Sequence, residues 1–123
     1  PAPVVIRESK GAGITALAVS GARLIAAEEK TGRLVAMTPG AAESTLGATT
    51  FRRPIALAAD VAGRISVLDE KAGTVTRLSP AGEVRETLDL GAAGIARALA
   101  IAAGPEGALR VLDGATGSVA VVP

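Results

Sequence analysis

The sequence predicts an all-β protein of three four-stranded antiparallel sheets that repeat along the chain. The first observation is a period: the turn glycines Gly32, Gly73 and Gly117 lie 41 (73 − 32) and 44 (117 − 73) residues apart. The second is that each unit holds short β-branched and aliphatic runs separated by Gly or Pro, as strands are. The third is that no window keeps an apolar period of 3.6 residues, so no helix is expected. A four-stranded repeat of about 40–45 residues is typical of a β-propeller blade.

The first strand of each unit carries an Ala-Leu-Ala motif. Its leucines, Leu17, Leu57 and Leu99, align the three units with spacings of 40 (57 − 17) and 42 (99 − 57) residues. Because alternate strand residues face opposite sides of a sheet, the alanines share one face and the leucines the other. A face of methyl groups suits the innermost strand of a propeller, where neighbouring blades converge on the central channel.

The second strand of each unit ends in an acidic residue, at Glu28, Asp69 and Asp113. The strand residues before these acids form two apolar rows, which we expect in the core between blades. The rows are Leu24, Ile65 and Leu109, and Ala26, Val67 and Val111.

The recurring acids have two interpretations. A ring of carboxylates could bind a cation or a substrate. Alternatively, each carboxylate accepts backbone N–H groups in the turn that the glycine four residues later completes. We favour the structural interpretation, because a single binding site does not require one acid in every repeat. The predicted structural turn residues are therefore Glu28, Asp69, Asp113, Gly32, Gly73 and Gly117.

The number and order of the predicted strands indicate how the chain is divided into blades. Residues 83–90 form a fourth strand in the middle unit, and residues 43–46 form a weaker one in the first. The third unit ends after its third strand, whereas residues 3–9 form a spare strand before the first unit. The expected division is a closing strand in residues 1–10, blade 1 in 11–50, blade 2 in 51–92, and three strands of blade 3 in 93–123.

Three blades do not ordinarily close a ring, since propellers typically have about four to eight. An open arc exposes blade faces and strand edges, which favours association. We therefore expect half of a six-bladed propeller, completed by a second copy in a homodimer or by the remaining blades of a longer chain. In a dimer, each N-terminal strand would finish the last blade of the other copy.

The middle unit resembles an NHL-type propeller repeat, and residues 111–122 are also similar to YVTN and PQQ-like blades. The resemblance rests on a Pro-x-hydrophobic-Ala start, an Asp-x-x-Gly turn and a strand ending in Asp. The matching residues are Pro54, Ala56, Asp60, Gly63, Asp69 and Gly82. The other two units depart from this pattern, with Gly13 and Ala96 at the proline position. The resemblance implies a propeller that acts as a binding scaffold or as a lyase.

Composition argues against most chemistry. The chain has no His and no Cys, which removes the commonest general base and the usual transition-metal ligands. We expect no catalytic residue, no metal site and no cofactor. The net charge is +1, and Arg52-Arg53 is the densest basic pair. RNA binding there lacks stacking aromatics, since Phe51 is the only aromatic residue. A salt bridge or a solvent-exposed loop face explains the pair more simply.

The function expected from the sequence is a non-catalytic propeller scaffold that binds a protein or peptide through its loop face, with Arg52 and Arg53 as binding residues. The alternative is part of an NHL-like lyase or hydrolase whose catalytic residues lie on another segment or chain. Nucleic acid is not an expected partner, and no run approaches the ~20 apolar residues of a membrane span. The start at Pro1 fits either a cleaved signal segment or an excised fragment, and we expect a secreted or periplasmic location.

Overall fold

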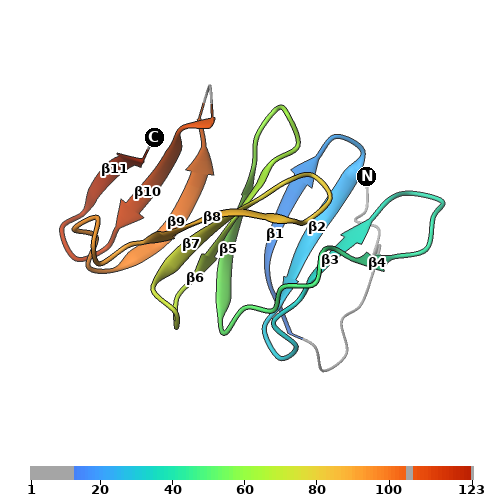
Figure 1. Cartoon of the computed structure of the whole chain (residues 1–123), viewed down its shortest axis with the longest axis horizontal. Coiled ribbons are helices and arrows are strands. Elements are labelled where there is room, and N and C mark those ends of the chain that lie inside the picture. The colour runs from blue at the N-terminus through green and yellow to red at the C-terminus, as the bar shows by residue number, and fades with distance from the viewer. Residues whose placement is uncertain (1–12, 105–106, 123) are drawn as a thin grey trace, which may run out of the picture.

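The structure, a computed structural model, describes residues 13–104 and 107–122, and it is all-β as predicted (Figure 1). Blade 1 contains strands β1 (Ile14–Ser20), β2 (Arg23–Glu28), β3 (Leu34–Met37) and β4 (Ser44–Thr45). Blade 2 contains β5 (Pro54–Ala59), β6 (Ile65–Asp69), β7 (Thr74–Leu78) and β8 (Val84–Asp89). Blade 3 contains β9 (Ala98–Ala103), β10 (Leu109–Asp113) and β11 (Ser118–Val122). Each blade is an antiparallel meander in chain order.

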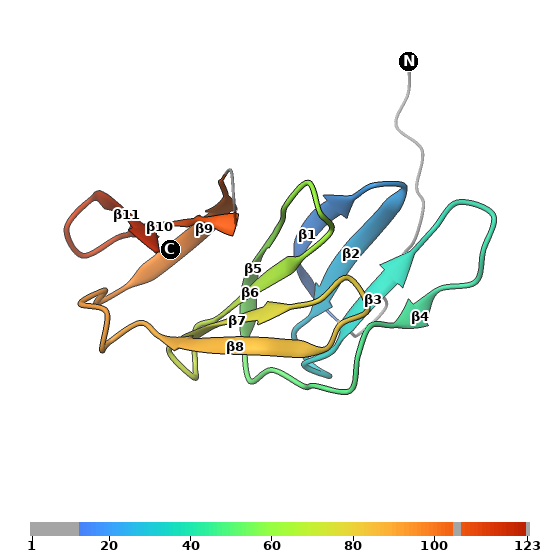
Figure 2. The ribbon, with the colours of Figure 1, turned by 45° about the horizontal axis from the view of Figure 1, so that its top comes forward.

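The blades stand face to face, with their first strands β1, β5 and β9 adjacent to one another (Figures 1 and 2). The Thr15 hydroxyl donates a 2.6 Å hydrogen bond to the Pro54 carbonyl, which joins the two neighbouring inner strands. Because a meander reverses at every turn, its turns alternate between two loop faces. We call the face with the β1–β2, β5–β6 and β9–β10 turns the first loop face and the opposite one the second.

Two apolar cores fill the joints between blades. At the first joint, Ile25 and Leu34 of blade 1 pack against Ile65 and Val67 of blade 2, and all four are fully buried. The second joint holds Leu68 and Val75 of blade 2 with Leu109 and Val111 of blade 3. The predicted rows of the second strands therefore do form inter-blade core in blades 2 and 3. Burying a side chain of this size contributes about 1.5–3 kcal/mol.

The alignment of the third unit on Leu99 is wrong by two residues. The strand register pairs Leu57 with Val67 in blade 2, and Ile101 with Val111 in blade 3, so Ile101 is the structural equivalent of Leu57. The error arose because Ala-x-Ala occurs twice in this stretch, at residues 98–100 and 100–102, and the second occurrence is the equivalent of residues 56–58. A bulge in each first strand leaves Thr15, Ile55 and Leu99 without a direct partner between two paired residues. Leu99 is thus a bulge residue, and it is 43% exposed.

The fourth strands lie where the sequence predicts them, although β4 has only two residues. The closing strand predicted in residues 1–10 lies outside the described residues. Within the described part, blade 3 has three strands, so the outer edge of β11 has no neighbouring strand. No helix long and apolar enough to cross a membrane occurs in residues 13–104 or 107–122.

Candidate functional site

The recurring acids end β2, β6 and β10, and all three side chains are buried. The Asp69 carboxylate accepts the backbone N–H groups of Arg52 at 2.8 Å, Arg53 at 3.0 Å and Ala72 at 3.2 Å. The first two donors belong to the linker that leads into β5, and the third belongs to the β6–β7 turn. Asp69 therefore joins the start of its blade to the turn beside it.

Asp113 repeats this arrangement in blade 3. Its carboxylate accepts the backbone N–H groups of Ala115 at 2.9 Å and of Ala96 and Arg97 at 3.3 Å each. The hydrogen bond from Ala115 is the largest influence on its pKa. Together with the Ala96 and Arg97 bonds, it outweighs burial and holds the Asp113 pKa below its usual value.

Glu28 uses its longer side chain differently. It accepts a hydrogen bond from the Thr31 hydroxyl at 3.0 Å and pairs with the Arg33 guanidinium. The three acids sit one per blade. No group of three or more acidic, His or Cys side chains placed to hold a metal occurs in the described part of the chain.

The turn glycines share one geometry. Gly32, Gly73 and Gly117 have φ between 68° and 72°, and each N–H donates to the carbonyl of the acid four residues earlier. Gly32 has a further constraint, because a Cβ there would lie 2.1 Å from the Phe51 carbonyl oxygen. Only glycine fits both the backbone conformation and that approach.

Arg52 and Arg53 lie on the second loop face, in a hollow formed with Glu29, Glu70 and Lys71. The Arg53 guanidinium is 3.4 Å from Glu70 and 3.8 Å from Glu29, which joins the turns of blades 1 and 2. All three side chains are about half exposed, so these ion pairs contribute little stability. The Arg52 side chain has no ion pair with a described residue.

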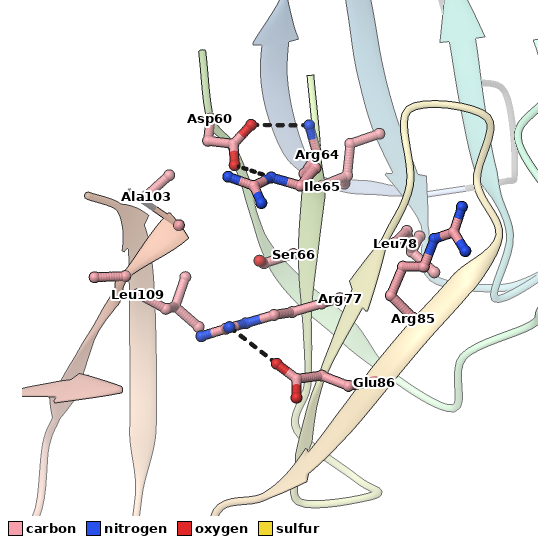
Figure 3. Close-up of a pocket in the computed structure, with 12 residues that line it drawn as sticks. Asp60, Arg64, Ile65, Ser66, Arg77, Leu78, Arg85, Glu86, Ala103 and Leu109 are labelled. Carbon is pink, nitrogen blue, oxygen red and sulfur yellow. Dashed lines mark hydrogen bonds and ion pairs between the residues drawn. The ribbon is translucent and has the colours of Figure 1, made fainter. Parts of the chain in front are cut away.

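Another cleft opens on the first loop face, between blades 2 and 3 (Figure 3). Its volume is about 470 Å³. Ser66, Arg77 and Glu86 lie side by side across blade 2 and form one wall, because the strand register pairs Ser66 with Arg77 and Arg77 with Glu86. Leu109 of blade 3 forms part of the other wall.

This polar row replaces an apolar one. The equivalent positions of blade 1 are Ile25 and Ala36, which the register pairs with each other. Ile25 and Ala36 are buried in the core of the first joint. The propeller fold therefore accepts apolar residues at these positions, so the polar row is a departure that packing does not require.

Arg77 links the two blades across the cleft. Figure 3 shows its side chain extending from β7 towards Leu109. The guanidinium is 2.9 Å from Glu86 and donates a 3.2 Å hydrogen bond to the Val122 carbonyl of β11. Its Nε is buried and has no hydrogen-bond partner among the described residues. An orphaned buried donor costs about 1–3 kcal/mol and is uncommon in native proteins.

A second pair, Asp60 with Arg64, lies at the mouth of the cleft. Arg64 approaches Asp60 through its backbone N–H at 2.9 Å and its side-chain Nε at 2.6 Å. Burial raises the Asp60 pKa, but the hydrogen bonds from Arg64 and Ala62 and the charge of Arg64 outweigh it, so the pKa is lowered overall. Arg85 also lines the cleft. It is the residue that a bulge in β8 leaves between the paired residues Val84 and Glu86, and Figure 3 shows its side chain directed away from Arg77.

Sequence reasoning missed this cleft. The available signal was the alternation of β6, β7 and β8, which places Ser66, Arg77 and Glu86 on one face. This pattern can be recognised only when the strand register is known, because the three residues are 11 (77 − 66) and 9 (86 − 77) positions apart in the chain.

The chain matches no family model, and no curated protein is similar to it at the level required for a match. Solved structures of β-propellers resemble it closely in fold. Virginiamycin B lyase from Staphylococcus aureus superposes with a TM-score of 0.69 at 14% identity, covering 89% of this chain and 41% of the lyase chain. A chain of the nidogen/laminin complex gives a TM-score of 0.72 at 17% identity, covering 88% of this chain and 42% of that one. The calcium-binding protein regucalcin from Agrobacterium tumefaciens gives 0.64 at 17% identity, covering 80% and 37%.

These likenesses show a β-propeller fold. The chain spans about two fifths of the length of these neighbours, which agrees with a partial propeller of three blades.

Proposed function

We propose that this chain is a non-catalytic β-propeller binding module of NHL type, which binds a protein or peptide segment on a loop face. The observation that carries the proposal is the cleft between blades 2 and 3. There Ser66, Arg77 and Glu86 occupy positions that blade 1 fills with packed apolar residues or, at Ser44, leaves uncharged.

The chemistry of the cleft favours a peptide. Arg77 and Ser66 offer donors, whereas Glu86 and Asp60 offer acceptors. Arg64 and Arg77 are each paired with an acid, which leaves Arg85 as a single lining arginine without an ion pair to a described residue. One such charge is too little to attract a polyanion. An extended peptide presents alternating N–H and C=O groups and suits such a mixed wall. Ala103 and Ala108 of blade 3 supply accessible apolar surface beside it.

The same residues are poorly suited to acid–base catalysis. Asp60 has a lowered pKa, so it stays ionised near neutral pH and makes a poor general acid. Glu86 pairs with Arg77. The alternative, a lyase or hydrolase whose catalytic residues lie on another segment or chain, draws on the lyases among the structural neighbours. At 14–16% identity these show the fold alone.

The NHL assignment is supported by the turn after β5. Asp60 and Gly63 of the Asp-x-x-Gly motif bond to each other, through the Gly63 N–H and the Asp60 carbonyl at 3.0 Å. The Asp60 carboxylate also accepts the Ala62 N–H at 3.0 Å.

The module is proposed to work as a homodimer, because three blades leave two blade faces without a neighbour. Further blades of a longer chain are the alternative.

The test is selection of binders from a displayed library of random 12-residue peptides, followed by calorimetry. The double variant Ser66→Ile, Arg77→Ala copies the residues of blade 1 and is expected to weaken the selected peptides at least ~10-fold. It should keep most of its stability, because Glu86, which loses its partner, is 47% exposed and can be solvated, and because the unpaired buried Nε of Arg77 is removed.

The matched control is Arg52→Ala, Arg53→Ala on the second loop face, which should leave affinity unchanged. If the selected peptides lost affinity only in this control, the binding site would lie on the second loop face instead. A library that yields no binder would contradict the proposed function.

A further inference from the structure

The outer face of blade 3 is built like a blade joint but has no described neighbour. Leu112 and Val119 are paired across β10 and β11. Their equivalents in blade 2, Leu68 and Val75, are 0% exposed at the second joint, whereas Leu112 is 36% and Val119 62% exposed. We call this surface, with Ala100, Arg110 and Val121, the open face of blade 3.

Blade 1 carries the complementary surface. Leu17 and Val19 of β1 point away from blade 2 and are 56% and 70% exposed. The equivalent of Leu17 in blade 2 is Leu57, which is 8% exposed because it packs against blade 1. Leu24 and Met37 line an adjoining apolar hollow of about 710 Å³. We call this surface the open face of blade 1.

The two internal joints define how such faces meet. In both, the face that carries Ala27 or Leu68 packs against the opposite type of face on the next blade. The open face of blade 3 corresponds to the faces that carry Ala27 and Leu68. The open face of blade 1 corresponds to the faces that pack against them. One chain therefore carries both halves of a third joint, at opposite ends.

We infer that the open face of blade 3 in one copy packs against the open face of blade 1 in a second copy, and the reverse, so that two copies close a six-bladed ring. This inference rests on the proposed homodimer and adds the two surfaces that form it. Both joints are the same contact between unlike faces, and a two-fold rotation closes them.

The test measures the molar mass of the intact chain and of three single-residue variants by light scattering on a sizing column. Each variant changes one valine to glutamate. The intact chain should have a mass near 24 kDa, twice its 12.1 kDa. Val119→Glu and Val19→Glu place a charge on opposite open faces, and each should weaken dimerisation at least ~100-fold, because an unpaired carboxylate would be buried at both joints. Val61→Glu is the matched control: Val61 is fully exposed in the β5–β6 turn, and its variant should remain a dimer.

Mixing separates a ring from other dimers. A mixture of Val19→Glu and Val119→Glu chains retains one unaltered joint per mixed pair, so dimers should reappear. Val121→Glu gives a second variant of the open face of blade 3, and far-UV circular dichroism checks that every variant is folded.

A monomeric intact chain, or a polydisperse series of larger assemblies, would overturn the inference. So would a Val19→Glu variant that stays dimeric, since two blade 3 faces would then be meeting each other. The peptide cleft lies within one copy, so peptide binding by monomeric Val119→Glu tests the proposed binding function independently.

Discussion

Replacing Asp69 with Asn tests whether the recurring acids stabilise the blades. The carboxylate accepts three backbone N–H groups, at 2.8, 3.0 and 3.2 Å, and is 3% exposed. Asn keeps the shape and the oxygen that faces Arg53 and Ala72, but it turns an amide NH₂ towards the Arg52 N–H. If Asp69 instead served only a ligand, the substitution would change binding and leave stability unaltered.

The expected loss follows from the bonds. A hydrogen bond to a charged acceptor contributes about 1.5–3 kcal/mol, and a neutral one about 0.5–1.5. Two weakened bonds and one lost bond sum to roughly 3–5 kcal/mol. With a urea m-value of about 1.5 kcal/mol/M, the midpoint should fall by roughly 2–3 M.

Asp89→Asn is the control for this measurement. Asp89 is exposed and accepts one backbone N–H, from Ala92 at 3.1 Å, so its loss should stay below about 1 kcal/mol. The assay is urea unfolding followed by far-UV circular dichroism. Equal midpoints for the two variants would refute the structural role of Asp69.

Further expectations concern the turns, the loss of stability at acidic pH and the core. Gly32→Ala should destabilise by about 3 kcal/mol or more and Gly117→Ala by about 1 kcal/mol. Both have positive φ, but only Gly32 faces the Phe51 carbonyl; similar unfolding midpoints would show that the close approach is unimportant. Asp60 and Asp113 have pKa values lowered by folding, so the unfolded chain takes up protons first. Their contribution is present above about pH 4, near the unfolded value, and is lost as the pH falls through the lower folded values. Melting temperatures from pH 7 to pH 3 should therefore drop mainly below about pH 4, and the drop should be shallower in Asp113→Asn; identical slopes would contradict this. Ala27→Leu should cost about 1–3 kcal/mol, because Ala27 is fully buried in the first joint, whereas exposed Ala92→Leu should be neutral in the same urea assay.

The period and the turn glycines predicted the fold because they are local properties. A glycine at positive φ and an acid four residues before it define a turn whatever surrounds them. Their spacings of 41 and 44 residues place every second and third strand. The first strand of blade 3 was aligned wrongly because Ala-Leu-Ala at residues 98–100 matches the motif better than Ala-Ile-Ala at residues 100–102, which holds the equivalent place in the sheet. Ala98 and Ala100 both sit in Ala-rich sequence, and only pairing with Asp113 and Leu112 distinguishes them.

The sequence by itself determined the strands and their order in three antiparallel sheets, because alternation and turn chemistry act between residues close in the chain. Only the tertiary structure decided what the faces of the blades do. Ser66, Arg77 and Glu86 became one polar wall through strand register, and the guanidinium of Arg77 reached Val122, 45 residues away, through the docking of blade 3 on blade 2. Leu68 and Leu112 hold the same place in their sheets, yet one is buried and the other exposed. That difference depends on which neighbour stands opposite, and the side chain alone cannot specify it, because burial is a property of two packed surfaces.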